Sequence, residues 1–414
     1  MSGSPGDHDQ RQQAWAAMRA RPEVAIALEY LRANAEAHLE QQIAIAQVAA
    51  PGWHEAERAA LMRRAFRRVG LADVDIDPAG NVLGWRRGER PGTLVVAAHL
   101  DTVFPAGTDV TVKRAGTRLT GPGLADDSRG LACLLALAEA LDAGRIRTDH
   151  TVLFVADVGE EGLGNLRGIK YLFIESRHRE RLEAFISIDG TDGFTITNGA
   201  VGSRRYKVTV SGPGGHSYLD FGLVNPVHAV GRIIARLASA DVPALPKTTY
   251  SVGLVGGGTS INAIPSEAWL QVDLRSEGVE ELARLDRAFF DAVGSGVADE
   301  TALRAPSGSQ LACDVKLLGE RPAGATPPEL PIVQAAWWAT REVGLEPVLD
   351  SGSTDAGAPT ALGIPAICIG GGGTAGELHS LGEWFDPTDA YKGVQRALLI
   401  ILALDLAHST AQEV

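Results

Sequence analysis

The chain has 414 residues, of which 45% are hydrophobic and 21% charged, so it is long enough for more than one hydrophobic core and its composition excludes intrinsic disorder. Its formal net charge of −13 argues against a nucleic acid or an anionic membrane as a partner, because both would repel a surface of that sign. The three cysteines include no Cys-x-x-Cys pair, which excludes a disulfide framework and a thiolate zinc site. Since no apolar run approaches about 18 residues, we expect a cytoplasmic protein without a signal peptide or a membrane span.

The first half of the chain alternates between helical and extended patterns. Apolar residues recur at helical spacing over residues 22–49 until Ala50-Pro-Gly, and two short alternating runs lie between residues 73 and 85. The next elements follow in this order: a buried strand at 94–98, a helix at 128–143, a strand at 151–156, a helix at 166–175 and a strand at 184–188. This alternation predicts an α/β fold with a mostly parallel central sheet flanked by helices.

The pattern changes near residue 203. Alternating strands and two longer helices follow, at 205–211, 224–239, 248–255, 267–275 and 279–294, and a Pro/Gly-rich segment at 319–328 marks their end. Helix and strand alternation then resumes, with elements at 330–343, 366–369 and 388–406. We therefore expect a discontinuous catalytic domain over residues 1–203 and 317–414, with an inserted α+β domain over residues 204–316.

Metal-ligand side chains follow several of the predicted strands. Ligands of open α/β sheets bind beyond the carboxyl ends of the strands, and an aspartate that precedes a helix is placed by the helix dipole. Five residues fit such positions: His99, Asp126, Glu161, Asp189 and His379. Imidazole and carboxylate together suit zinc, or manganese and cobalt, and five ligands are too many for one open catalytic zinc. The sequence therefore predicts two divalent metal ions per chain, most readily zinc.

Two further acidic residues extend this hypothesis. Asp101 stands two residues after His99, where its carboxylate can orient the imidazole, and Glu160 stands beside Glu161, where it can act as a general base. Each feature has a simpler interpretation: a charged turn, the cap of a helix, an acidic helix start or an ordinary loop histidine. These simpler interpretations weaken jointly, because all of them would have to coincide at one edge of one sheet.

The chain resembles a known family, the co-catalytic zinc metallopeptidases, which include aminoacylase, peptidase T, glutamate carboxypeptidase and the acetylornithine and succinyl-diaminopimelate deacylases. The resemblance covers roughly residues 25–405 and is strongest to peptidase T-like members. The segments that carry it are Ala98-His-Leu-Asp-Thr-Val-Phe-Pro, Gly123-Leu-Ala-Asp-Asp-Ser-Arg-Gly, Gly159-Glu-Glu-Gly, Ile188-Asp-Gly, Gly214-Gly-His-Ser, Thr259-Ser-Ile-Asn-Ala-Ile-Pro, Asp273-Leu-Arg and Leu378-His-Ser-Leu-Gly-Glu.

The resemblance implies roles for the metal-site residues. Asp126 would bridge the two metals, His99 and Asp189 would complete one site, and Glu161 and His379 the other. Glu160 would be the general base and Asp101 would orient His99.

The resemblance also implies that the inserted domain is a lid and dimerisation domain. His216 would reach the active site of the partner in a homodimer and stabilise the oxyanion, while Asn262 and Arg275 would hold the substrate carbonyl and carboxylate. One departure is that Ser128 stands where this family often has lysine, two positions after the bridging aspartate.

These features predict hydrolysis of an amide bond in a small substrate, first a peptide of two or three residues. An N-acyl-amino-acid deacylase with the same residues is the alternative, because the motifs describe the reacting amide and a carboxylate anchor only. A non-catalytic metal or peptide binder is a third possibility, against which Glu160 argues, since a binder needs no proton shuttle.

Overall fold

The computed structural model describes residues 5–407, which form two compact units. One unit contains the described residues up to Ala200 and from Ala325 onward, and the other is Val201–Gly324. Residues 1–4, which bear on the expectation about a signal peptide, lie outside the described part. Within residues 5–407 no helix combines the length and the apolar character needed to cross a bilayer.

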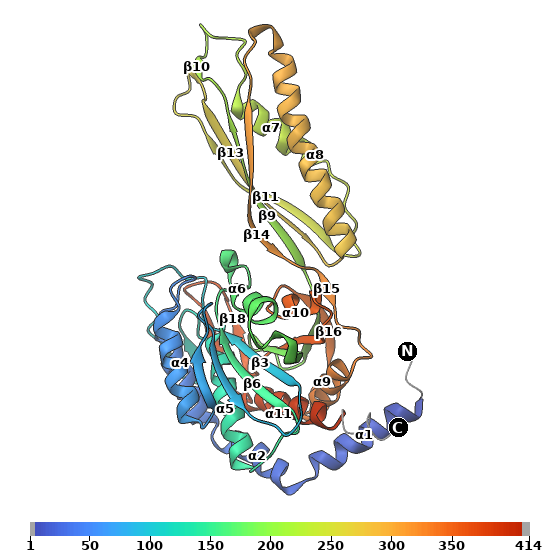
Figure 1. The fold of residues 1–414 in the computed structure, drawn as a ribbon. Coiled ribbons are helices and arrows are strands. Elements are labelled where there is room, and N and C mark those ends of the chain that lie inside the picture. Colours follow the sequence, from blue (N-terminus) through green and yellow to red (C-terminus); the bar gives the residue numbers. More distant parts are fainter. Residues whose placement is uncertain (1–4, 408–414) are drawn as a thin grey trace. The chain divides into compact units, whose positions relative to one another are not determined.

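A nine-stranded sheet is the centre of the first unit (Figure 1). Its strands lie in the order β1 (Ala72–Ile76), β2 (Val82–Arg86), β6 (Thr151–Asp157), β3 (Thr93–His99), β7 (Leu182–Ile188), β17 (Ala366–Ile369), β8 (Thr195–Ala200) and β15 (Gly324–Ala325), with β16 (Val348–Gly352) paired to β8. The central pairs β6–β3, β3–β7 and β7–β17 are parallel. The α/β prediction with a mostly parallel sheet is therefore confirmed.

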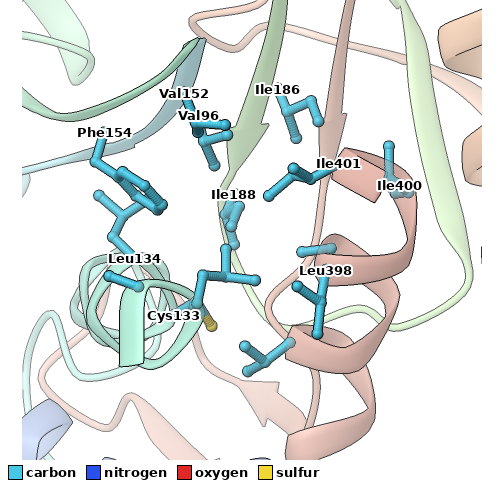
Figure 2. Packing of buried hydrophobic residues seen from close by; sticks show 14 of the residues in the cluster. Val96, Cys133, Leu134, Val152, Phe154, Ile186, Ile188, Leu398, Ile400 and Ile401 are labelled. Carbon is cyan, nitrogen blue, oxygen red and sulfur yellow. The ribbon is translucent and has the colours of Figure 1, made fainter. Parts of the chain in front are cut away.

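Helices cover both faces of this sheet. One face packs against α1 (Pro5–Arg19), α2 (Pro22–Ala33), α4 (Ala56–Arg68), α5 (Ser128–Ala143), α9 (Pro331–Glu342) and α11 (Tyr391–Ala407). Figure 2 shows this layer, where Val96, Phe154 and Ile186 of the strands meet side chains of α5 and α11. The other face packs against α6 (Arg167–Lys170), the short π-helix Tyr171–Glu175 and α10 (Gly357–Ala361). Every residue of β3 and β6 is buried, as expected of strands covered on both sides.

The predicted helix over residues 22–49 is interrupted. It consists of α2 and α3 (Ala35–Ala46), and the break falls at Asn34, which ends α2 with a non-helical backbone and bonds its own side chain to the Tyr30 carbonyl. Helix α1 has few apolar residues, and the sequence pattern missed it although Trp15 and Met18 are buried.

The second unit contains a four-stranded antiparallel sheet. Its order is β11 (Thr248–Gly257), β13 (Glu267–Ser276), β9 (Gly202–Ser211) and β14 (Ala312–Arg321), and α7 (Pro226–Leu237) and α8 (Val279–Leu303) pack on it. A short ribbon, β10 (Gly215–His216) with β12 (Ala263–Ile264), extends from its end. Strand β14 runs through residue 316, where we expected the insert to end, because it pairs with β9 as far as Arg321.

Candidate metal centre

Three neighbouring parallel strands bring the candidate ligands to one edge of the central sheet. His99 is the last residue of β3, Glu160 and Glu161 follow β6, and Asp189 follows β7 directly. Because these strands are adjacent and parallel, their carboxyl ends meet at the same edge. The sequence order of strands and loops thus places four candidate side chains together.

Asp126 lies at the centre of the cluster. Its Oδ1 is 2.9 Å from Nε2 of His99, and its Oδ2 is 3.0 Å from Nε2 of His379. His379 Nε2 is also 3.1 Å from a carboxylate oxygen of Glu161, and His99 Nε2 is 3.9 Å from one of Asp189. All five candidate ligands therefore converge, with one carboxylate between two imidazoles.

The cluster concentrates negative charge in a buried place. Burial raises the pKa of Glu161 to about 7 and that of Asp189 to about 8, and neighbouring carboxylates add to both shifts. The hydrogen bond to Asp126 raises the pKa of His379 to about 9. Burial opposes the ionisation of Asp126, but hydrogen bonds with His379 and His99 hold its pKa below the usual range.

These pKa shifts, together with the donor atoms of the cluster, indicate whether the site fits metal ions. The carboxyl groups of Glu161 and Asp189 resist ionisation because too little positive charge faces them. In the metal-free chain such charge comes from protonated imidazoles of the cluster. Divalent cations would supply the same charge and take the same nitrogen and oxygen atoms as ligands. Two overlapping groups, which share His99, have ligand atoms close enough together to hold an ion: His99, Asp126 and Glu161, and His99, Asp127 and Asp189. The donor set fits divalent metals.

Asp101 contacts His99 through its main-chain carbonyl oxygen, whereas the sequence predicted a contact through its carboxylate. Nδ1 of His99 is 2.9 Å from the main-chain carbonyl oxygen of Asp101 and 3.7 Å from its carboxylate. The carboxylate instead accepts hydrogen bonds from the main-chain N–H groups of Gly159, Glu160 and Glu161, at 2.9 to 3.1 Å. Asp101 thus holds the loop that carries Glu160, which is itself buried.

Three buried residues outside the predicted set of site residues support the candidate ligands. Both carboxylate oxygens of Asp127 accept main-chain N–H groups, one from His99 and one from Gly130. The fully buried Glu383 carboxylate accepts the N–H groups of residues 123, 125 and 126 and so fixes the loop of the bridging candidate. Arg58, also fully buried, donates to the Leu100 carbonyl between His99 and Asp101.

These supporting residues carried only weak sequence signals. Glu383 ends one of the segments quoted for the family resemblance, and Asp127 stands next to a proposed ligand. Arg58 stands in an ordinary amphipathic helix, where nothing distinguishes it from its exposed neighbours.

The remaining candidates lie in the second unit. His216 in β10 pairs with Ala263 of β12, and the Ser217 N–H donates to the Asn262 carbonyl, so His216 and Asn262 are neighbours. Arg275 stands at the other end of the sheet, where its Nε donates to Asp273 at 2.7 Å. The structure brings the first two residues together and separates the third from them.

Comparison with known proteins identifies the family of the chain and structures that share its fold. The profile of Peptidase family M20/M25/M40 matches residues 95–403. A putative succinyl-diaminopimelate desuccinylase of Mycobacterium tuberculosis is 29% identical over 324 residues, covering 74% of this chain and 82% of that protein. Two crystal structures share the fold: an aminopeptidase PepT of Bacillus cereus (TM-score 0.73, 21% identity, covering 90% and 99% of the two chains) and a tripeptidase of Staphylococcus aureus (TM-score 0.74, 22%, 90% and 99%).

An α/β fold with histidine and carboxylate side chains gathered at the strand ends is typical of a metal-dependent hydrolase. The family match covers most of the chain, and the chain belongs to Peptidase family M20/M25/M40, whose members are metallopeptidases and amidohydrolases.

Proposed function

We propose that this protein hydrolyses the amide bond of a dipeptide or tripeptide, with two divalent metal ions, zinc in the first place and manganese or cobalt as alternatives. The observation that carries the proposal is the position of Asp126 between His99 and His379, with Glu161 and Asp189 beside them. In this proposal Asp126 is shared by both ions. The bound ions would lower the pKa of water and polarise the scissile carbonyl.

Glu160 is the proposed proton carrier. It is buried and lies close enough to Glu161 and Asp189 for its charge to raise the pKa of both. The loop that carries it is fixed through the three N–H groups that bond to Asp101. Glu160 therefore takes a proton from the attacking water and delivers it to the leaving nitrogen.

His216, Asn262 and Arg275 are the proposed substrate-binding groups of a homodimer. The register of β13 on β9 runs from Glu267 opposite Ser211 to Arg275 opposite Ser203, roughly 27 Å at about 3.4 Å per residue. His216 and Asn262 lie beyond the Glu267 end. An extended tripeptide spans only about 11 Å, so one copy cannot place all three groups on one substrate. This supports His216, and Asn262 with it, acting in the site of the partner subunit.

Mixing two inactive variants tests this arrangement. Glu160→Gln removes the base from a subunit's own site, and His216→Ala removes the donor from the partner's site. Random exchange of subunits makes about half of the dimers mixed, and each mixed dimer has one complete site, so about a quarter of all sites should be active. Recovery of activity close to that fraction supports action in the partner's site. Mixed dimers that form and stay inactive would show that His216 serves its own subunit.

An N-acyl-amino-acid deacylase is the second candidate, favoured by the likeness to the putative desuccinylase. Zinc-loaded protein assayed with dipeptides, tripeptides and N-acyl amino acids, before and after chelation, separates the candidates. Chelator-sensitive cleavage of peptides above N-acyl amino acids supports the peptidase proposal. Deacylation without peptide cleavage reverses the order, and metal-free protein that gains no hydrolysis on adding zinc, manganese or cobalt contradicts both.

A further inference from the structure

Trp53 presents its indole to solvent close to the loop of Glu160. The side chain is 64% exposed although tryptophan is among the residues that gain most from burial. Its backbone has φ of 70°, a left-handed conformation that is unfavourable for a residue with a large side chain. Exposure and strain both work against folding stability, so the position of this ring needs another explanation.

Two charged residues fix the main chain and the ring of Trp53. The main-chain N–H of Trp53 donates to Oε1 of Glu55 at 2.9 Å, and Nη2 of Arg167 donates to the same oxygen at 2.6 Å. The guanidinium carbon of Arg167 lies 4.3 Å from the centre of the indole. One face of the ring is therefore stacked on a cation whose charge Glu55 balances, and the ring is fixed in orientation.

The same arginine connects the ring to the proposed catalytic loop. A Cβ added at Gly159 would come within 2.1 Å of Nη1 of Arg167, so the guanidinium lies against the backbone directly before Glu160. The main chain before Trp53 is also tied to this loop, because Pro51 forms a β-bridge with Thr102. Thr102 follows Asp101, whose carboxylate accepts a hydrogen bond from the Gly159 N–H. Trp53 is thus linked, through Arg167, to the main chain of the loop that carries Glu160.

We propose that Trp53 is a substrate-binding residue that selects a large apolar side chain on the amine side of the scissile bond. This inference rests on the proposed amide hydrolysis. Glu160 must reach the leaving nitrogen, so the substrate residue that carries this nitrogen lies nearest to the Gly159 loop and its tryptophan. The ring already stacks on Arg167, so a second cation would be repelled and an aliphatic or aromatic group is favoured.

The test compares substrates that differ only in the amine-side residue. The variant is Trp53→Gly, because glycine adopts this backbone conformation without strain, with Trp53→Phe to restore an aromatic face and Trp337→Ala as a control at another partly exposed tryptophan. For Trp53→Gly we expect kcat/KM on Gly-Phe and Gly-Leu to fall at least about tenfold, mainly through KM. Values for Gly-Ala and Phe-Gly should change less than about twofold, and Trp53→Phe should recover most of the loss.

Binding measured without turnover separates this inference from the proposed function. Zinc-loaded protein carrying Glu160→Gln, with and without Trp53→Gly, is titrated with Gly-Phe and Gly-Ala by calorimetry. Weaker binding of Gly-Phe alone supports the role of Trp53 even if the wild type cleaves no peptide, which would sink the proposed function only. Equal affinities, no binding of Gly-Phe to either protein, or a loss confined to Phe-Gly hydrolysis would overturn the inference.

Discussion

Asp126 and His379 are 253 positions apart in the sequence, yet Oδ2 of the aspartate lies 3.0 Å from Nε2 of the histidine. The other carboxylate oxygen meets His99 at 2.9 Å, so one side chain joins segments from both parts of the discontinuous unit. A carboxylate in this position can be shared by two metal ions. Its neighbour Asp127 is placed differently, since its oxygens accept the main-chain N–H groups of His99 and Gly130.

Replacing Asp126 should therefore remove metal, and replacing Asp127 should not. For Asp126→Asn we expect metal content to fall from about two ions per chain to one or fewer and hydrolysis to fall at least about a thousandfold. Asp127→Asn should keep its metal but lose about 1 to 3 kcal/mol of unfolding free energy, because the amide keeps one acceptor oxygen and one buried N–H group loses its acceptor. Elemental analysis measures the metal content, a turnover assay measures hydrolysis, and thermal unfolding measures stability. Full metal content in Asp126→Asn would contradict the bridging assignment.

Variants of the two adjacent glutamates should separate metal binding from proton transfer. Glu160→Gln removes the proton carrier and leaves the five candidate ligands intact, so we expect full metal content with kcat lowered about 10² to 10⁴-fold. Glu161→Gln removes a candidate ligand 3.1 Å from His379, so we expect loss of metal and of activity together. Both variants are compared by elemental analysis and kcat on the best peptide substrate. Unchanged turnover in metal-loaded Glu160→Gln would disprove its catalytic role.

Much of the central unit was predictable from local pattern. Strands β3 and β6 are continuous apolar runs and α5 is buried along most of its length, so composition alone marks them as central elements. The candidate ligands followed from their positions after such strands. Strand β14 was missed because it is a charged edge strand in which only two of ten residues are buried, which leaves no clear periodic signal.

The supporting contacts of the site were not predictable in the same way. The sequence places Asp101 two residues after His99 and favours contact between their side chains. In the structure its carboxylate bonds to the loop at 159–161, which the neighbouring strand β6 delivers. Such contacts depend on which strands are neighbours, and nothing in the local sequence records that.

Stability of the metal-free protein should fall as the pH rises. The folded chain holds protons on Glu161 and Asp189, whose pKa values burial raises to about 7 and about 8, and on His379, whose hydrogen bond to Asp126 raises its pKa to about 9. From the ordinary carboxyl pKa near 4 up to about pH 9, the folded state therefore binds more protons than the unfolded state, and stability declines across that window.

Thermal unfolding with a chelator at pH 5.5, 7 and 8.5 should give a steadily decreasing Tm. Adding zinc should abolish or reverse this decrease, because the bound cations favour the ionised carboxylates. Asp189→Asn, which removes one of the raised carboxyls, should flatten the metal-free curve. A metal-free Tm that increases from pH 5.5 to 8.5 would show that the cluster is ionised without metal.

Glu383 should control metal affinity without being a ligand. Its fully buried carboxylate accepts the N–H groups of Gly123, Ala125 and Asp126, at 3.1, 2.8 and 3.3 Å, and so holds the main chain of the proposed bridging residue. In Glu383→Gln the amide group can present only one acceptor oxygen, and its NH₂ faces an N–H donor, so the loop loses at least one bond. Residues of this kind typically change metal affinity about 10 to 100-fold, and we expect a loss of that size measured by competition with a zinc-binding dye.

The exposed Glu329, changed to Gln, is the matched control for the lost charge and should leave zinc affinity unchanged. In Glu383→Gln, saturating zinc should restore most of kcat, since the five candidate ligands and Glu160 remain. A kcat that stays low at full occupancy would instead place Glu383 in the chemical step, and unchanged affinity would mean that the loop at 123–126 keeps its conformation without this carboxylate.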